Sequence, residues 1–288
     1  MLDFSSNPTK LALTCCLFAF MLVGCGQAVD GTPTITAAVT NTLIPSPTKT
    51  PTEVSATATT IPAVWQELQP GLEMRRLEIN AKALLAIRVD LAQLVLKVHY
   101  DPQDPKTVAE WQAVTNALVV VNAGFFEPDD TTSGLLILDG VSVGESFDPN
   151  EPYLEHSGML TVRGEQGGIY MLSNCPPQNC TQAEQAVQGL PVLIHDAQPV
   201  DFALPERAAR RTVAALDAAG NLLLIIAYEE IMTLPELRDG FLETDLELES
   251  ALNLDGGPSS GMLVKIGRYN VVIDSVSEVP SVIALYAR

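Results

Sequence analysis

The feature that most limits how this chain can fold is a stretch, residues 31–62, that consists mostly of Thr, Pro, Ala and Ser. It has no aromatic residue and no apolar periodicity, so it cannot bury enough surface to offset the entropy lost on ordering. We therefore expect residues 25–63 to form a disordered tether. The folded part should follow it, in residues 64–288, a length of about 225 residues that suits one domain with one core.

The N-terminus predicts export. Residues 11–23 are almost wholly apolar (LALTCCLFAFMLV), but a helix of this length spans only about 20 Å, less than a bilayer core of roughly 30 Å. Residues 1–24 are therefore interpreted as a signal peptide. The segment Leu-Val-Gly-Cys that ends at Cys25 resembles the bacterial lipobox, which implies an acylated Cys25 that anchors the protein on the extracytoplasmic side of the cell envelope. The alternative is an ordinary signal peptide in which Cys25 has no role.

Charge and cysteine content narrow the range of partners. The formal net charge of −19 argues against nucleic acid and anionic membrane surfaces as partners, and an anionic substrate would need a local basic site. In an exported domain, Cys175 and Cys180 predict a disulfide that closes a short loop. A metal site would need further ligands nearby, and the sequence offers none there. No cofactor is expected, although a divalent metal ion is left open.

The pattern of apolar residues favours strands. Runs rich in β-branched and aliphatic residues predict strands at residues 84–89, 94–99, 118–121, 135–138, 159–162, 213–216 and 222–228. The first two and the last two are each expected to form a hairpin. Capping boxes that begin at Thr107 and Thr233 predict two helices, and a third is expected at residues 245–252. This order, without strict β–α–β alternation, predicts an α+β fold: a single mixed domain, strand-rich, with a few helices packed on the sheet.

Two polar turns are candidates for a functional site. The sequence Asn-Ala-Gly-Phe-Phe (residues 122–126) follows a buried strand, and Asn-Leu-Asp-Gly-Gly-Pro-Ser-Ser-Gly (residues 253–261) lies near the end of the chain. Such loops often carry function on a rigid scaffold. The plainer interpretation is ordinary turn chemistry, since Asn, Asp and Gly favour turns in any protein.

Together with the segment around Arg210-Arg211-Thr212, these turns resemble the phosphodiester glycosidase family. The resemblance covers most of residues 118–288 and keeps the order of the family's motifs, of which Ala-Leu-Asn-Leu-Asp-Gly-Gly-x-Ser (residues 251–259) is the most specific. Ala123 and Pro258 depart from the usual pattern. The resemblance implies a glycoside hydrolase that cleaves a sugar from a sugar-1-phosphodiester, with a phosphorylated envelope or extracellular glycan as substrate.

The chemistry assigns roles to these residues. A phosphate leaving group needs little protonation, so the site needs donors for the phosphate more than a strong acid. Arg211 is the candidate for that clamp, and strand alternation allows only one of Arg210 and Arg211 to face the site. Asp255 is the candidate for the catalytic carboxylate. The remaining candidates are Glu127 or Asp139 as a second carboxylate (Asp139-Gly140 also suits a hairpin turn), Asn122, Asn253 and Ser259 as hydrogen-bonding residues, and Gly124, Gly256 and Gly257 where the backbone approaches the ligand.

Two rival functions remain to be weighed. The sequence Gly-Pro-Ser-Ser-Gly (residues 257–261) fits the nucleophile elbow of α/β-hydrolases, which needs a strand before the serine, a helix after it and a later histidine. Here a helix is expected before it and a strand after it, and no histidine lies beyond His195, so we reject that function. The other rival is a non-catalytic lipoprotein that binds a glycan or assists exopolysaccharide assembly.

Overall fold

The computed structural model describes residues 61–288 except 149, 152–153, 176 and 204–206, and these residues belong to a compact unit that spans Ser55–Arg288. The expected signal peptide, Cys25 and all but the end of the expected tether lie outside the described residues. No helix in the described ranges is long and apolar enough to span a bilayer.

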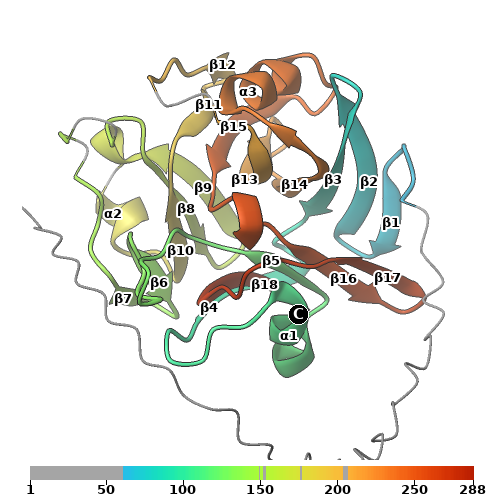
Figure 1. The fold of residues 1–288 in the computed structure, drawn as a ribbon, viewed down its shortest axis with the longest axis horizontal. Helices are drawn as coiled ribbons and strands as arrows, with labels where there is room; N and C mark the ends of the chain where they lie inside the picture. Colours follow the sequence, from blue (N-terminus) through green and yellow to red (C-terminus); the bar gives the residue numbers. More distant parts are fainter. Residues whose placement is uncertain (1–60, 149, 152–153, 176, 204–206) are drawn as a thin grey trace, which may run out of the picture. The chain divides into compact units, whose positions relative to one another are not determined.

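The domain is built from three antiparallel sheets (Figure 1). The largest has the strand order β1 (Gln66–Gln69), β2 (Leu72–Ile79), β3 (Lys82–Val89), β14 (Leu222–Met232), β13 (Ala209–Asp217), β15 (Leu248–Asn253), β11 (Val192–His195) and β12 (Gln198–Pro199). The second has the order β7 (Val141–Val143), β6 (Leu136–Leu138), β10 (Gln185–Gly189), β8 (Gly158–Arg163) and β9 (Gln166–Met171). The third has the order β17 (Tyr269–Ile273), β16 (Met262–Ile266), β5 (Val119–Asn122), β18 (Ser281–Ala287) and β4 (Leu94–Tyr100).

Inner side chains of all three sheets form one shared core, and this explains the continuous apolar runs of the sequence. In β14, Leu222, Leu224 and Ile226 point into the shared core. The alternate residues Leu223 and Ile225 pack in a second cluster on the other face of the same sheet. Because both faces are covered, the strand is apolar throughout rather than alternating. The strand-rich α+β prediction is confirmed.

Short helices cover the outer faces of the sheets (Figure 1). α3 (Leu234–Leu242) begins after the capping box of Thr233 and buries Leu237 and Phe241 against the largest sheet. α1 (Val108–Thr115) begins after the capping box of Thr107 and packs Trp111 against the third sheet. Both predicted helix starts are therefore confirmed. The remaining helical segments are η1 (Leu172–Asn174), α2 (Pro177–Cys180) and η2 (Gly257–Ser259).

Most of the predicted strands are present, and so is the expected disulfide between Cys175 and Cys180. The expected pairing of β13 with β14 is confirmed, with the turn at residues 218–220. The other expected hairpin is wrong: β3 pairs with β2 and β14, whereas β4 pairs with β18 in a different sheet. The segment Asp90-Leu91-Ala92-Gln93 therefore carries the chain from one sheet to another instead of reversing it.

The helix expected at residues 245–252 is also wrong, because this segment forms β15. Its side chains alternate between two cores: Ala251 packs in the cluster under α3, and Leu252 packs in the shared core. Apart from Glu249, the strand is buried on both faces, and such a run is hard to distinguish from a buried helix by its pattern alone. Because a strand, and not a helix, precedes residues 257–261, one argument against a nucleophile elbow there no longer holds. However, a second strand, β16, follows the serines where an α/β-hydrolase needs a helix.

Candidate active site

The two polar turns found in the sequence lie against each other where β5 and β15 end. Asn122, the last residue of β5, is buried, with 1% of its surface exposed. Its Nδ2 donates a hydrogen bond of 2.7 Å to the backbone carbonyl of Asp255. Its Oδ1 accepts from the hydroxyl of Thr212 (2.7 Å) and from the backbone N–H of Gly261 (3.1 Å). The amide of Asn122 is therefore engaged within the protein and holds the Asp255 turn in place.

Backbone hydrogen bonds fix Asp255 from two directions. The N–H of Asp255 donates to the carbonyl of Ala123 (3.2 Å), just after β5 in the third sheet. The N–H of Leu254 donates to the carbonyl of Thr212 (2.9 Å), on β13 of the largest sheet. The segment that carries Asp255 is thus joined to two sheets at once.

The carboxyl group of Asp255 lies in an environment that disfavours its charge. Burial raises the pKa of Asp255 from 3.8 to about 6. Hydrogen bonds from the hydroxyl of Ser259 and from the backbone N–H of Gly256 oppose this rise, because they stabilise the carboxylate; the bond from Gly256 measures 2.7 Å. A carboxyl group with a pKa near neutrality can exist in either protonation state under physiological conditions, as acid–base and glycosidase chemistry requires.

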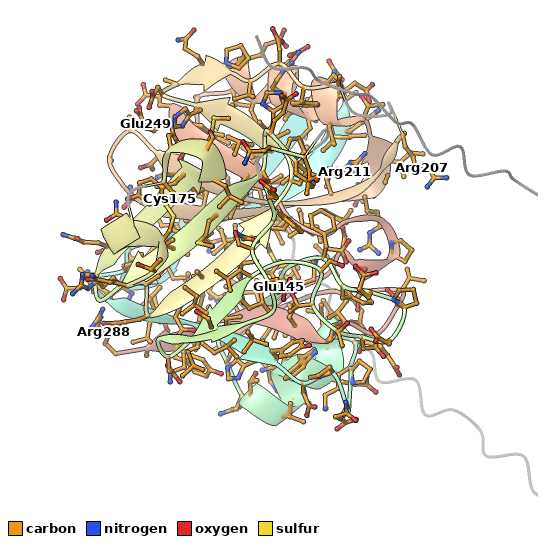
Figure 2. The ribbon with its side chains drawn as sticks, turned by 90° about the vertical axis from the view of Figure 1, so that its left-hand side faces the viewer. Glu145, Cys175, Arg207, Arg211, Glu249 and Arg288 are labelled. Carbon is orange, nitrogen blue, oxygen red and sulfur yellow. A yellow bond between two sulfur atoms is a disulfide. The ribbon has the colours of Figure 1, made fainter. Side chains whose placement is uncertain are left out.

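Arg211 presents its guanidinium group beside this turn, from β13. Its Nε donates to the carbonyl of Met232 (3.0 Å), and its Nη2 donates to the carbonyl of Arg207, which lies next to it (Figure 2). Nη1 makes no hydrogen bond within the described part of the chain, and it lies 3.9 Å from the point where a Cβ on Gly256 would stand. Burial lowers the pKa of Arg211, but an arginine remains charged at neutral pH. The Arg211 side chain is therefore held rigidly with one nitrogen free.

Arg210 also lies at the turn, on the opposite side of the strand from Arg211. Its two terminal nitrogens both donate to the backbone carbonyl of Asp274, at 3.3 Å each, and its Nε is buried without a hydrogen-bond partner in the described residues. The carbonyl of Arg210 lies 2.9 Å from the position of a Cβ on Gly256. The Asp255 turn thus contacts the backbone of Arg210 and the side chain of Arg211, and the expectation that only one of the two arginine side chains faces the site stays a prediction.

Three glycines of the two polar turns, Gly124, Gly256 and Gly257, differ in how strictly the structure requires glycine. Gly256 has no room for a side chain, since a Cβ at 2.9 Å from a backbone oxygen would force the chain apart. Gly257 has φ +64°, which favours glycine. Gly124 is buried, but an added Cβ there would make ordinary contacts of 3.4–3.5 Å, so space alone does not require glycine.

Asn253 and Ser259 flank Asp255. The Nδ2 of Asn253 donates to the carbonyl of Leu190 (2.6 Å), while its Oδ1 is buried and without a partner in the described residues. Asn253 is 3% exposed, and leaving a buried acceptor unpaired costs free energy. Its Oδ1 is therefore an unsatisfied acceptor that is enclosed in the protein. Ser259 is buried, and its hydroxyl donates a hydrogen bond to the carboxyl group of Asp255.

The two candidates for a second carboxylate do not contact this cluster in the structure. Glu127 is exposed and accepts a hydrogen bond from Ser133 (2.6 Å). Asp139 occupies the two-residue turn between β6 and β7, with positive φ at both Asp139 and Gly140, and it contacts Lys97 and Gln185. The hairpin interpretation of Asp139 is thus confirmed. Asp255, which is partly buried, is therefore the candidate carboxyl group that lies in the turn itself.

Thr212 was not singled out from the sequence, although it joins Asn122 to Asp255. Because it follows Arg211 on a strand, it points to the opposite face, where its hydroxyl meets Asn122 and also lies 3.2 Å from the hydroxyl of Ser260. Strand alternation would have been the signal that identifies it.

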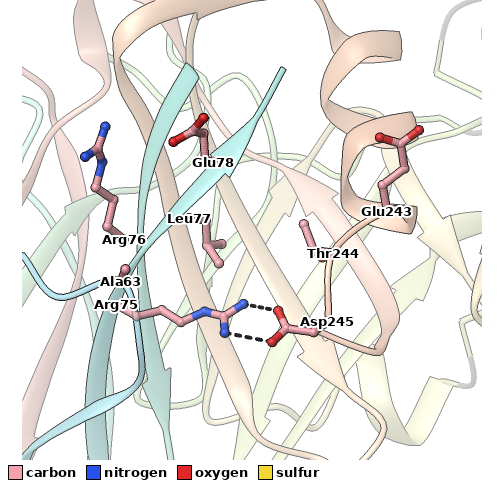
Figure 3. A pocket seen from close by; sticks show the side chains of 8 residues that line it. All are labelled: Ala63, Arg75, Arg76, Leu77, Glu78, Glu243, Thr244 and Asp245. Atoms are coloured by element: carbon pink, nitrogen blue, oxygen red, sulfur yellow. Dashed lines mark hydrogen bonds and ion pairs between the residues drawn. The ribbon is translucent and has the colours of Figure 1, made fainter. Parts of the chain in front are cut away.

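A cavity of about 510 Å³ lies away from Asp255, between β2 and the segment after α3 (Figure 3). Its most buried cation, Arg75, forms a two-pronged ion pair with Asp245 and stacks on the ring of Trp65, 4.8 Å from its centre. That charge is therefore already neutralised inside the protein. The described residues also contain no group of three or more His, Cys, Asp or Glu side chains placed to hold a metal ion.

One protein-family model matches this sequence. The family model described as phosphodiester glycosidase matches residues 115–286, which include both polar turns and the two arginines. No protein with a curated description matches the sequence.

Two solved structures share the fold. The catalytic domain of zebrafish N-acetylglucosamine-1-phosphodiester alpha-N-acetylglucosaminidase, auto-inhibited by its pro-peptide, has 16% sequence identity and a TM-score of 0.59, over 80% of this chain and 87% of that domain. A hypothetical protein from Synechocystis has 14% identity and a TM-score of 0.54, over 75% of this chain. The present chain spans 62% of the length of the Synechocystis protein. At these identities, the likeness is one of fold.

Proposed function

This chain belongs to the phosphodiester glycosidase family, and from that premise we propose that it hydrolyses the bond between a sugar and a phosphodiester. Asp255 would be the catalytic carboxylate, and arginine at the same turn would bind the phosphate. The observation that carries the proposal is the buried carboxyl group of Asp255, with a pKa raised to about 6, at a turn flanked by Arg210 and Arg211.

The reaction suits this arrangement. The bond between C1 of the sugar and the phosphate oxygen breaks, and its electron pair leaves with the phosphate, which becomes a phosphate monoester. A water molecule supplies the hydroxyl group for C1 and the proton for the products. The ionised Asp255 stabilises the positive charge that develops on the sugar ring. The free Nη1 of Arg211 donates to the departing phosphate, where a charge-assisted hydrogen bond strengthens as negative charge accumulates.

Neighbouring groups would orient the sugar. We assign the Oδ1 of Asn253, which lacks a partner in the described residues, to a sugar hydroxyl; this atom is enclosed, so the assignment requires the turn to open when the sugar binds. Asn122 holds the Asp255 turn in place, because its Nδ2 and its Oδ1 both form hydrogen bonds within the protein. Its role is to position Asp255 rather than to bind substrate.

The location of the substrate follows from the N-terminal sequence. We infer that Cys25 is acylated and holds the domain at the cell envelope, with the Thr- and Pro-rich segment as a spacer. The substrate would then be a phosphorylated envelope or extracellular glycan. Because the zebrafish protein that shares the fold is an N-acetylglucosamine-1-phosphodiester alpha-N-acetylglucosaminidase, N-acetylglucosamine 1-phosphodiesters are the first compounds to test.

The deciding experiment is a hydrolysis assay of the purified protein against a panel of sugar-1-phosphodiesters with methyl, aryl and nucleotide leaving groups. Each reaction is run with and without a chelator, which decides whether a divalent metal ion assists. We expect release of free sugar from at least one compound and loss of that release in Asp255→Asn. Binding without release, unchanged by that substitution, would favour the non-catalytic glycan-binding lipoprotein instead.

A further inference from the structure

A second polar groove lies along β9, the outermost strand of the second sheet, which pairs only with β8. It consists of two adjoining hollows of about 360 Å³ and about 430 Å³ that share Gly167, Gly168 and Tyr170 in their walls. The first hollow also includes Arg163 and Glu165, and the second is lined in addition by residues that include Asn174, His195, Asp196 and Glu249. We refer to the two hollows together as the Tyr170 groove.

The aromatic ring of Tyr170 is held in a fixed position in this groove. The ring lies back along the strand over Gly168, where a Cβ would stand only 2.4 Å from the ring carbon Cε2 and 2.6 Å from the phenol oxygen. Glycine at this position is therefore what allows the ring to lie flat on the backbone. The phenol oxygen accepts a hydrogen bond of 2.8 Å from Nδ2 of Asn179, inside the loop that the disulfide Cys175–Cys180 closes. Packing on Gly168 and the hydrogen bond from Asn179 therefore hold the ring of Tyr170 in place.

Polar side chains around the ring have unused hydrogen-bonding capacity. The side chains of Asn174 and Glu249 make no hydrogen bond within the described residues. His195 has only a long contact of 3.8 Å with Asp196. A rigid aromatic ring surrounded by free donors and acceptors is suited to a ligand with an apolar face and many hydroxyl groups.

The charge of the groove limits the ligand further. The first hollow has one carboxylate, Glu165, and one cation, Arg163, in its lining, and the second is lined by two carboxylates, Asp196 and Glu249, without a lysine or arginine. Arg163 also shares a hydrogen bond with Gln182 (3.4 Å). An anionic ligand would be repelled here, in a domain whose chain already carries a net charge of −19.

We propose that the Tyr170 groove binds a neutral oligosaccharide, with one sugar ring stacked on Tyr170 and its hydroxyl groups bonded to Asn174, His195 and Glu249. This site is separate from Asp255. Glu249 and Asp255 are six residues apart along β15 and its continuation, a separation of about 20 Å in an extended chain. In Figure 2, Glu249 and Cys175 lie toward one side of the viewed face, and Arg211 lies toward the other. The groove would hold a glycan without taking part in its cleavage.

The experiment is calorimetric titration of the full chain, purified in detergent, with cellotetraose, maltotetraose and tetra-N-acetylchitotetraose at millimolar concentrations. Tyr170→Ala removes the platform and should weaken binding of the preferred probe at least about tenfold, a loss of about 1.4 kcal/mol. Tyr170→Phe keeps the ring and is the matched control, with affinity expected within about threefold of the wild type. The same sugar carrying a terminal phosphate should bind more weakly than the neutral probe, and Glu249→Gln should reduce that difference.

The proposal is overturned if none of the neutral probes binds, if Tyr170→Ala binds as the wild type does, or if the phosphorylated sugar binds more tightly than the neutral one. Should Tyr170→Ala fail to fold, the double variant Asn174→Ala/Glu249→Ala decides the matter. These two side chains make no hydrogen bond within the described residues, so the fold should tolerate their loss. Unchanged binding of the preferred probe in that variant would equally overturn the proposal.

Discussion

The side-chain amide of Asn122 donates a 2.7 Å hydrogen bond to the backbone carbonyl of Asp255, although 133 positions separate the two residues in the sequence. The bond crosses from the end of one sheet to the turn that follows a strand of another. It makes the position of the candidate catalytic carboxylate dependent on a residue from a distant part of the chain, whose Nδ2 and Oδ1 both form hydrogen bonds within the protein.

The first prediction concerns this support. Asn122→Ala leaves the N–H of Gly261 without its acceptor and the carbonyl of Asp255 without its donor, while the hydroxyl of Thr212 keeps only its neighbour Ser260. Each buried group left unpaired costs about 1–3 kcal/mol, so we expect the free energy of unfolding to fall by about 2–5 kcal/mol in denaturant titrations. Thr212→Ser keeps the hydroxyl and serves as the control, with a much smaller loss. An Asn122→Ala protein as stable as the wild type would show that the network does not hold the turn.

The second prediction concerns the pH dependence of activity. If the ionised Asp255 stabilises the developing sugar cation, kcat/KM should fall about tenfold per pH unit below the pKa of about 6. Asp255→Asn should abolish turnover at every pH. Ser259→Ala removes a hydrogen bond that stabilises the carboxylate, so the midpoint of the acid limb should move to higher pH. A midpoint near pH 4 in the wild type would contradict the raised pKa of Asp255, and a midpoint that Ser259→Ala leaves unchanged would argue against Asp255 as the titrating group.

The third prediction concerns stability and pH. The pKa of Asp255 is higher in the folded state, about 6, than its ordinary value of 3.8, so the folded state binds the extra proton between these values. The contribution of Asp255 to the free energy of unfolding is therefore greatest below pH 4, falls as pH rises from about 4 to about 6, and is constant above that. The total fall from this one group is up to about 3 kcal/mol. Asp255→Asn has no charge to bury. We expect it to unfold with the same free energy as the wild type near pH 4 and with a higher one at pH 8, as measured by denaturant titration. An equal difference at both pH values would contradict the proposed burial of the charge.

The fourth prediction separates the two arginines. With a sugar phosphodiester and an aryl glycoside that lacks phosphate as paired substrates, Arg211→Ala should lower kcat/KM of the diester by about 1.5–3 kcal/mol, or tenfold or more, and affect the aryl glycoside far less. Arg211→Lys should remain poor, because lysine cannot reproduce the bonds that hold the guanidinium group to Met232 and Arg207.

Arg210→Ala is the matched comparison for this prediction. If it, and not Arg211→Ala, discriminates between the substrates, the phosphate is bound by the buried Nε of Arg210. Equal losses on both substrates from Arg211→Ala would make its role structural.

The fifth prediction concerns the anchor. Cys25→Ser should move the protein from the membrane fraction to the soluble fraction of cells, and mass spectrometry of the wild type should find a lipid-modified cysteine at the mature N-terminus. Detection of an unmodified N-terminus at a residue after Cys25 would instead support an ordinary signal peptide.

The sequence predicted best where the signal is local. The capping boxes of Thr107 and Thr233 begin helices as expected, because the two reciprocal hydrogen bonds of a capping box depend on residues only three apart. The turn at Asp139 and Gly140 and the disulfide between Cys175 and Cys180 are local in the same sense.

Prediction failed where tertiary context decides. The segment that forms β15 was expected to be a helix, since a run buried on both faces carries no alternation to reveal a strand. β3 and β4 were expected to pair with each other, and nothing in either strand shows that their partners lie far away in the sequence. For the site, the sequence identified Asn122 and Asp255, but only coordinates could show that the amide of Asn122 is used to hold the turn.

The placement of β18 has a consequence for the order of events in folding. β18 is inserted between β4 and β5, and its hydrogen bonds to both complete the third sheet. The two strands that it joins lie far earlier in the chain, so each of these pairings closes a long loop. Pairings between distant segments are slow to form, because the entropy of loop closure is lost before the contacts compensate for it. The third sheet is therefore the part of the core that we expect to close last.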